Sequence, residues 1–124
     1  MGKYILVVDD SPTIRVSVEF ALKSIGIPIE QAENGVDALT KIKTRSGKGD
    51  AIALGIVDVN MPQMDGITFI KNFRKDDKFT PLVVLTTESE EHKIQEGKDA
   101  GASGWIVKPF NANQLIDVVR KLLK

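Results

Sequence analysis

Polar residues able to bind a cation or a phosphate stand directly after several short apolar runs of this sequence. They comprise three carboxylates, two hydroxyls and one ammonium: Asp9, Asp10, Asp58, Thr86, Thr87 and Lys108. If the apolar runs are parallel strands of one open sheet, these residues meet beyond the carboxyl ends of the strands, where ligands bind in such sheets. The spacing therefore predicts one polar cleft built from distant parts of the chain.

The chemistry of such a cleft follows from its charges. Three carboxylates held together repel one another and raise at least one pKa unless a cation joins them. An all-oxygen site with few carboxylates suits Mg²⁺, which keeps several waters and often binds phosphates. Such a site can hold a phosphoryl group while one carboxylate attacks it, with Thr86 and Lys108 bonding the phosphoryl oxygens. The single histidine, His92, lies in a polar helical segment, and a carboxylate nucleophile needs no base.

Each of these residues also has an ordinary structural explanation. Asp10 can cap the helix that follows it, and Asp58 can be a loop aspartate bonded to nearby backbone. Lys108 can be a surface lysine. Taken singly, these explanations are the more frequent ones. Their coincidence at one sheet edge is what favours a functional cleft.

Five short apolar runs predict the strands that position the cleft. Most are continuous rather than alternating, which is typical of strands buried on both faces of a parallel sheet. Apolar residues recur at helical spacing between them. With right-handed crossovers, this alternation predicts a doubly wound α/β domain. The predicted strands are Tyr4–Val8, Ile27–Ala32, Ala53–Val57, Pro81–Thr86 and Gly104–Val107.

Local signals mark where several helices begin and end. Ser11 followed by Pro12 indicates an N-cap with proline in the first turn. Asn111 with Gln114 matches a capping box, and Gly26 stands where the first helix should stop.

Two segments have weaker patterns. Thr44–Asp50 contains Gly, Lys and Ser without strand or helix periodicity, and we expect a solvated loop there. The segment Ser89–Asp99 has helical character, but Ile94 is its only large apolar residue and Gly97 lies inside it. A helix that buries so little is either simply solvated or an element able to shift in a switch, and the pattern does not distinguish the two.

Length and composition narrow the class of protein. A chain of 124 residues is expected to form one domain. Lys plus Arg and Asp plus Glu both number 17, so no basic excess points to nucleic acid or to an anionic membrane. The chain has no cysteine, which excludes disulfides, thiolate metal sites and cysteine catalysis. No signal peptide or bilayer-spanning run is present, so we expect a cytoplasmic protein.

Four ordered motifs resemble the receiver domains of bacterial response regulators, and among these the single-domain chemotaxis regulators. The resemblance covers essentially the whole chain and implies one receiver domain over residues 1–124. It implies a flavodoxin-like fold with five helices and a five-stranded parallel sheet of order 2-1-3-4-5. The motifs are Val7-Val8-Asp9-Asp10, Val57-Asp58-Val59-Asn60-Met61-Pro62 through Asp65-Gly66, Leu85-Thr86-Thr87-Glu88, and Gly101 through Lys108-Pro109-Phe110.

The resemblance assigns a role to each carboxylate. Asp58 is the phosphoacceptor, receiving the phosphoryl group from a histidine kinase or a small phosphodonor. Asp9 and Asp10 form the acidic pair that binds Mg²⁺ together with Asp58, and Asp10 is the more direct ligand of the two. The backbone carbonyl of Asn60 completes the protein's share of the metal coordination.

The resemblance also assigns the groups that bind the phosphoryl oxygens. Thr86 is the switch hydroxyl, and Lys108 is the phosphoryl-binding lysine, joined to Pro109 by a cis peptide bond. Thr87 replaces a small residue beside this pocket, which alters the access of water to the acyl phosphate.

In this family the fourth helix, fifth strand and fifth helix form the surface that contacts a downstream protein. Trp105 occupies the position of an aromatic residue whose rotamer follows the switch hydroxyl, and Ile94 also matches the chemotaxis regulators. Glu91 and Val118 differ, because those regulators carry lysines at both positions. The resemblance implies a monomeric, cytoplasmic signalling switch, most similar to those of chemotaxis, that contacts proteins rather than DNA or membranes.

Several alternatives remain open at this point. The chain could be a phosphorelay intermediate or a receiver excised from a larger regulator. A phosphatase with an aspartate nucleophile is a different class, but such enzymes carry a second aspartate two positions later, where this chain has Asn60. A flavodoxin-type flavin module requires a hydroxyl-rich phosphate loop after the first strand, where Asp9 and Asp10 would repel the phosphate.

Overall fold

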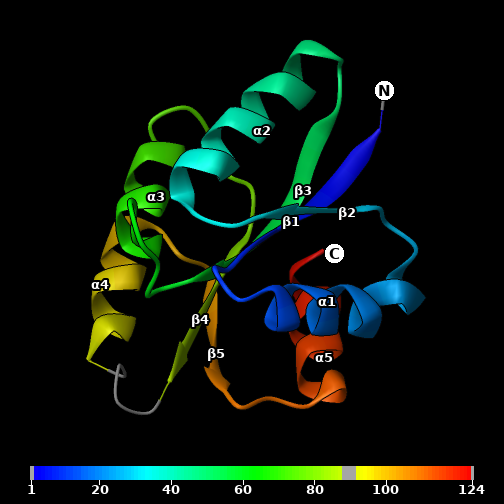
Figure 1. Ribbon diagram of the computed structural model, residues 1–124, viewed down its shortest axis with the longest axis vertical. Helices are drawn as coiled ribbons and strands as arrows, with labels where there is room; N and C mark the ends of the chain where they lie inside the picture. The colour runs from blue at the N-terminus through cyan, green and yellow to red at the C-terminus, as the bar shows by residue number, and fades with distance from the viewer. Residues whose placement is uncertain (1, 88–91, 124) are drawn as a thin grey trace.

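A single parallel sheet runs through the centre of the protein. A computed structural model describes residues 2–87 and 92–123, and its five strands lie in the order β2-β1-β3-β4-β5 (Figure 1). Every neighbouring pair of strands is parallel. Both the strand order and the doubly wound α/β class are as predicted. The strands are β1 Lys3–Val8, β2 Ile29–Ala32, β3 Ala51–Asp58, β4 Leu82–Thr87 and β5 Gly104–Lys108.

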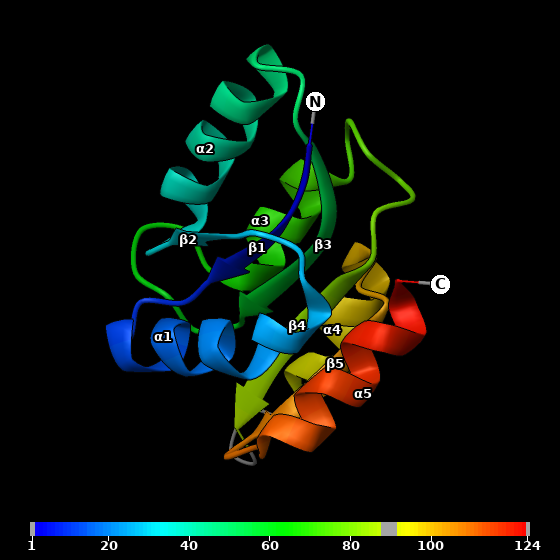
Figure 2. The ribbon, with the colours of Figure 1, turned by 90° about the vertical axis from the view of Figure 1, so that its right-hand side faces the viewer.

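Helices cover both faces of the sheet. α1, the short 3₁₀ helix η1 and α5 pack together on one face, and α2, α3 and α4 lie on the other (Figures 1 and 2). All five predicted helices are present among the described residues. Their bounds are α1 Pro12–Ala21, η1 Leu22–Ile25, α2 Gly35–Gly47, α3 Gly66–Phe73, α4 Lys93–Ala100 and α5 Ala112–Leu122.

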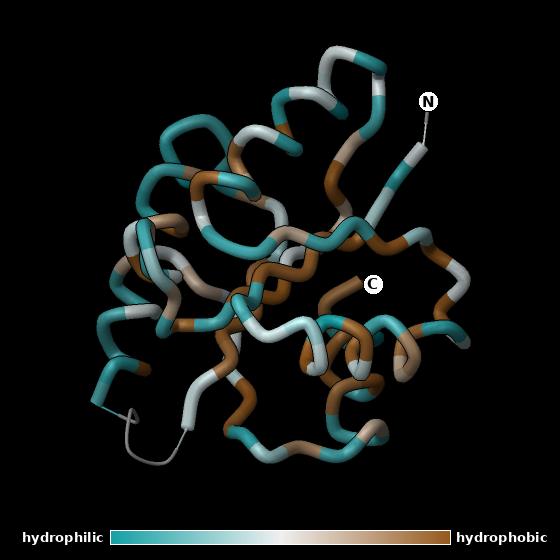
Figure 3. The backbone as a smooth tube through the Cα atoms, in the orientation of Figure 1, coloured by the Kyte–Doolittle hydropathy of each residue, from teal (hydrophilic) through white to brown (hydrophobic). Residues whose placement is uncertain are grey.

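The apolar core is divided by the sheet into two clusters. Successive residues of a strand point to opposite faces, so Ile5 and Val7 join the cluster under α1 and α5, whereas Leu6 and Val8 join the cluster under α2, α3 and α4. All four are fully buried. The hydropathy colouring shows apolar residues concentrated along the central strands (Figure 3). Because the strands are buried on both faces, their sequences are continuous apolar runs rather than alternating ones.

The helix ends follow the local signals in the sequence. The Ser11 side chain accepts a hydrogen bond from the backbone N–H of Ile14, which confirms Ser11 as the N-cap of α1 and leaves Asp10 free of that role. Asn111 and Gln114 form the predicted capping box of α5. Gly26 ends the first helical segment with a positive φ of 80°, a conformation that glycine adopts without strain.

The expectation of a loop over Thr44–Asp50 is wrong for most of its length, because α2 continues to Gly47. The Arg45 side chain donates hydrogen bonds to Glu30 of β2 and to Asp50, which ties the last turn of the helix to the neighbouring strands. Its guanidinium also lies 4.6 Å from the centre of the Tyr4 ring. Helical periodicity could not show this stabilisation, since it comes from residues distant in the sequence.

The fourth helix begins later than predicted, at Lys93, and residues 89–91 lie outside the described part of the chain. Gly97 is its one buried residue and packs against β4, where an added Cβ would lie 3.4 Å from a Val84 methyl carbon. Ile94 is half-buried. α4 is therefore held by a small contact area, as its composition indicated. Within the described residues, no helix has the length and apolar character needed to cross a bilayer.

Candidate functional site

The fold brings Asp9, Asp58 and Lys108 together at the carboxyl edge of the sheet. The Lys108 ammonium donates one hydrogen bond to Asp9 Oδ2 at 3.1 Å and another to Asp58 Oδ1 at 3.2 Å. Both carboxylates are buried, with Asp9 at 0% and Asp58 at 4% exposure. Asp9 directly follows β1, and Asp58 is the last residue of the neighbouring strand β3. Parallel pairing of these strands therefore accounts for the meeting of residues far apart in the sequence.

Asp10 completes a cluster of three carboxylates. One carboxylate oxygen from each of Asp9, Asp10 and Asp58 lies within 4.8 Å of the others. Asp10 is exposed while its two partners are buried, so the cluster opens to solvent on one side. This donor set consists only of carboxylate oxygens and leaves room for water, which fits the coordination preferences of Mg²⁺.

The cluster carries unfavourable electrostatics. Burial raises the pKa of the Asp58 carboxyl to about 6, and the Asp9 carboxylate adds to that rise, while Lys108 and the Asn60 backbone N–H oppose it. Burial alone would lower the pKa of Lys108, but the two carboxylates outweigh it and the net direction is upward. A single lysine therefore does not balance the buried negative charge, and a second cation at this site has a physical reason to bind.

The loop between β3 and α3 wraps closely around Asp58. The backbone N–H of Asn60 donates to the Asp58 carboxylate. Gly66, the first residue of α3, approaches so closely that an added Cβ would lie 2.1 Å from the Asp58 carbonyl oxygen. Only glycine fits there, and Asp65 caps the helix by accepting from the Thr68 N–H. Gly66 stands in the sequence motif without an assigned role, although an Asp-Gly pair just after a strand-end aspartate is a recognisable turn signal.

Thr86 and Thr87 end the neighbouring strand β4. Asp58 is paired with Leu85 in the sheet, so Thr86 stands one residue beyond it. Thr86 is completely buried, and its hydroxyl donates to the Thr87 backbone carbonyl at 3.3 Å. Thr87 is paired with Lys108 across to β5. The Lys108–Pro109 peptide bond is cis, as expected.

Trp105 and Ile94 lie on the face formed by α4, β5 and α5. The Trp105 side chain is 42% exposed, and the Lys98 ammonium of α4 lies 4.2 Å from its ring centre. A hollow of about 220 Å³ beside Trp105 is lined in part by Val118. Glu91 lies outside the described residues.

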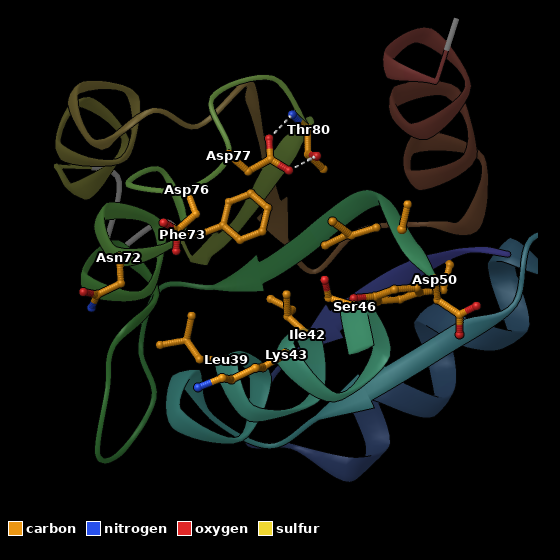
Figure 4. Close-up of a pocket in the computed structure, with 13 residues that line it drawn as sticks. Leu39, Ile42, Lys43, Ser46, Asp50, Asn72, Phe73, Asp76, Asp77 and Thr80 are labelled. Carbon is orange, nitrogen blue, oxygen red and sulfur yellow. Dashed lines mark hydrogen bonds between the residues drawn. The ribbon is translucent and has the colours of Figure 1, made fainter. Parts of the chain in front are cut away.

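A larger cavity of about 720 Å³ lies at the opposite edge of the sheet (Figure 4). It is lined by Leu39 and Ile42 of α2, by Phe73 of α3, and by the first residues of β1 and β3. None of the polar residues predicted to act together contributes to it. The candidate site is therefore the carboxyl edge, not this cavity.

Comparisons with known proteins agree with this geometry. Residues 5–120 match the family model described as the response regulator receiver domain. The chain is 37% identical over 123 residues to chemotaxis protein CheY-3 of Vibrio cholerae, covering 97% of this chain and 91% of that protein. It is 35% identical over 122 residues to sensor histidine kinase CheAY of Helicobacter pylori, covering 97% of this chain but only 15% of the kinase.

A solved structure shows the same fold. The chemotaxis protein CheY4 of Vibrio cholerae superposes with a TM-score of 0.87 at 41% identity, covering 99% of this chain and 100% of that one. The family resemblance and the fold class predicted from the sequence are both confirmed. The chain belongs to the response regulator receiver domain family, with chemotaxis regulators among its relatives.

Proposed function

We propose that this protein is a phosphorylation-activated switch of two-component signalling in which Asp58 accepts the phosphoryl group. The observation that carries the proposal is the triangle of Asp9, Asp58 and Lys108 at the carboxyl edge of the sheet. It supplies a nucleophile and a partner for the phosphoryl oxygens, and Asp10 beside it forms with Asp9 an acidic pair for a cation. Family membership supports the same function.

The transfer is a displacement at phosphorus. An Asp58 carboxylate oxygen forms the new O–P bond while the bond from phosphorus to the donor breaks. From a phosphohistidine donor that carries a proton on its other ring nitrogen, the leaving group is the neutral imidazole; from acetyl phosphate it is acetate. The product is an acyl phosphate on Asp58.

Asp9, Asp10 and Asp58 are the side chains that hold Mg²⁺ in this proposal, with the Asn60 carbonyl as a fourth protein ligand. When bound, the ion supplies positive charge that offsets the carboxylates and the incoming phosphoryl group. Lys108 moves little in this scheme: its ammonium already lies between Asp9 and Asp58. Thr86 must rotate its hydroxyl away from the Thr87 carbonyl to donate to a phosphoryl oxygen.

We further propose that the phosphodonor is a histidine kinase and that the output is a protein contact on the α4, β5 and α5 face, as in chemotaxis. The relatives named CheY-3 and CheAY support the kinase and the chemotaxis context. Exposed Trp105 and the hollow beside it give that face an apolar anchor. In this proposal residues 1–124 form one receiver domain that acts as a cytoplasmic monomer and contacts no nucleic acid or membrane.

The proposal is tested by intact mass spectrometry after incubation with acetyl phosphate, with Mg²⁺ or with EDTA. We expect one added phosphoryl group, only with Mg²⁺, and none in Asp58→Asn. A label that persists in the folded Asp58→Asn protein removes Asp58 from its role. Sustained release of phosphate from unrelated phosphomonoesters favours the phosphatase alternative, and transfer onward to a histidine phosphotransfer protein favours a phosphorelay intermediate.

A further inference from the structure

We infer that Arg15 positions the acidic pair for metal binding, although it lies outside the carboxylate cluster. The inference rests on the proposed function, because it concerns how Asp10 is presented to Mg²⁺. Arg15 is half-buried on the first turn of α1. Its Nη1 donates a hydrogen bond to the backbone carbonyl of Asp9.

That bond holds the Asp9–Asp10 peptide, one of the two peptide planes that flank Asp10. Asp9 itself is held through its N–H by the Ala32 carbonyl at 3.1 Å and through Oδ1 by the Ser11 N–H at 2.9 Å. Asp10 is exposed, and no hydrogen bond or ion pair to its side chain is seen among the described residues. The position from which the Asp10 side chain reaches the cluster is therefore set by the backbone on either side of it. The Asp9 carboxylate holds the Ser11 N–H on one side, and Arg15 holds the Asp9 carbonyl on the other.

Arg15 is itself held in place by a second contact. Its Nε donates to Gln31 Oε1 at 3.0 Å, and Gln31 Nε2 donates onward to Glu19 Oε1 at 2.7 Å. These two hydrogen bonds join α1 to β2, the edge strand next to β1. A planar guanidinium can serve both directions at once, which a lysine ammonium on a flexible stem cannot do with the same geometry.

Groups that orient a metal ligand without touching the metal typically contribute about 10–100-fold to metal affinity. Removing the Arg15 side chain frees the Asp9–Asp10 peptide to rotate. We expect Mg²⁺ to bind Arg15→Ala about 10-fold more weakly, and Arg15→Lys to fall between this variant and the wild type. Glu19→Gln keeps an acceptor for Gln31 at the far end of the bond chain and serves as the matched control.

The test is isothermal titration of Mg²⁺ into each metal-free protein, with thermal unfolding in EDTA to establish that each is folded. An Arg15→Ala affinity equal to the wild-type value overturns the inference, and so does an equal weakening in Glu19→Gln. If Arg15→Ala does not fold, the comparison of Arg15→Lys with the wild type decides. A wild-type protein that binds no Mg²⁺ refutes the metal site of the proposed function instead.

A double-mutant cycle separates positioning from general loosening of the fold. Once Asp10→Asn has removed the charged ligand, adding Arg15→Ala should weaken Mg²⁺ binding by less than about 2-fold, because its effect passes through Asp10. A further loss of about 10-fold in the double variant contradicts that route. In phosphorylation by acetyl phosphate, the Mg²⁺ concentration for half-maximal rate should rise in Arg15→Ala while the rate at saturating Mg²⁺ stays within about 3-fold.

Discussion

Burial has opposite effects on stability in the interior of the central strands and at their last residues. Val57 and Leu85 are completely buried in the apolar core, and burial of such side chains stabilises the fold. Asp58 follows Val57 directly and is also buried, yet its pKa is raised because burial disfavours its charge. Stability alone would not select a buried aspartate there. The contrast teaches that the strand ends retain an unfavourable arrangement that a cation and a phosphoryl group can use.

The largest expected effect lies on the apolar side of this contrast. Leu85→Ala removes a fully buried side chain one residue before Thr86 and should lower the free energy of unfolding by about 3 kcal/mol. Urea unfolding followed by circular dichroism measures the change. Phe79→Ala is the control, because Phe79 is 94% exposed, and it should change stability by less than about 0.5 kcal/mol. Equal effects of the two substitutions contradict the assigned core.

On the polar side, removing the charge should stabilise the metal-free protein. The pKa of Asp58 is about 6 when folded and 3.8 when unfolded, so the folded state binds its proton more tightly. Stability therefore falls as pH rises from about 4 to about 6, and the full penalty remains above about pH 6. Asp58→Asn does not carry this penalty and should be more stable than the wild type by about 2–3 kcal/mol at about pH 7.5, with the gap closing near about pH 4.

This prediction is checked by thermal or urea unfolding in EDTA at both pH values. Asp117→Asn is the matched control, since Asp117 lies exposed on α5, and it should show no such pH-dependent gain. Adding Mg²⁺ should shrink the gap, because at the proposed site the ion would bind the ionised Asp58 carboxylate of the wild type more tightly than the neutral amide of the variant. A wild type more stable than Asp58→Asn in EDTA at the higher pH shows that the buried charge is not unfavourable.

The smallest expected change in stability concerns the face formed by α4, β5 and α5. The Lys98 ammonium over the Trp105 ring is an exposed cation–π contact, worth about 0.5–1 kcal/mol. Lys98→Ala should cost no more than that in stability but should shift the emission of Trp105, the single tryptophan. The same emission should respond to Mg²⁺ or phosphorylation if Trp105 follows the switch. Lys71→Ala on α3 is the control, and an emission spectrum identical to the wild type in Lys98→Ala contradicts the contact.

Features that depend on continuous apolar runs and on helix-capping residues could be predicted from the sequence. The predicted bounds of the five strands lie within two residues of the observed ones because both faces of the sheet are buried. The end of α2 was missed because Arg45 is held by Glu30 and Asp50, contacts that no local pattern shows. The close approach of Gly66 to Asp58 and the bond from Arg15 to the Asp9 carbonyl were missed for the same reason.

The order of the residues was enough to show which of them end the strands and therefore which side chains gather at one edge, because a parallel sheet aligns its carboxyl ends whatever the details of packing. How far each of these side chains is buried, and which atoms it contacts, followed from the folded structure. Asp9 and Asp58 became buried partners of one ammonium while Asp10 stayed in solvent. Burial and distance set the pKa of Asp58, and both depend on contacts between distant segments that residue order does not specify.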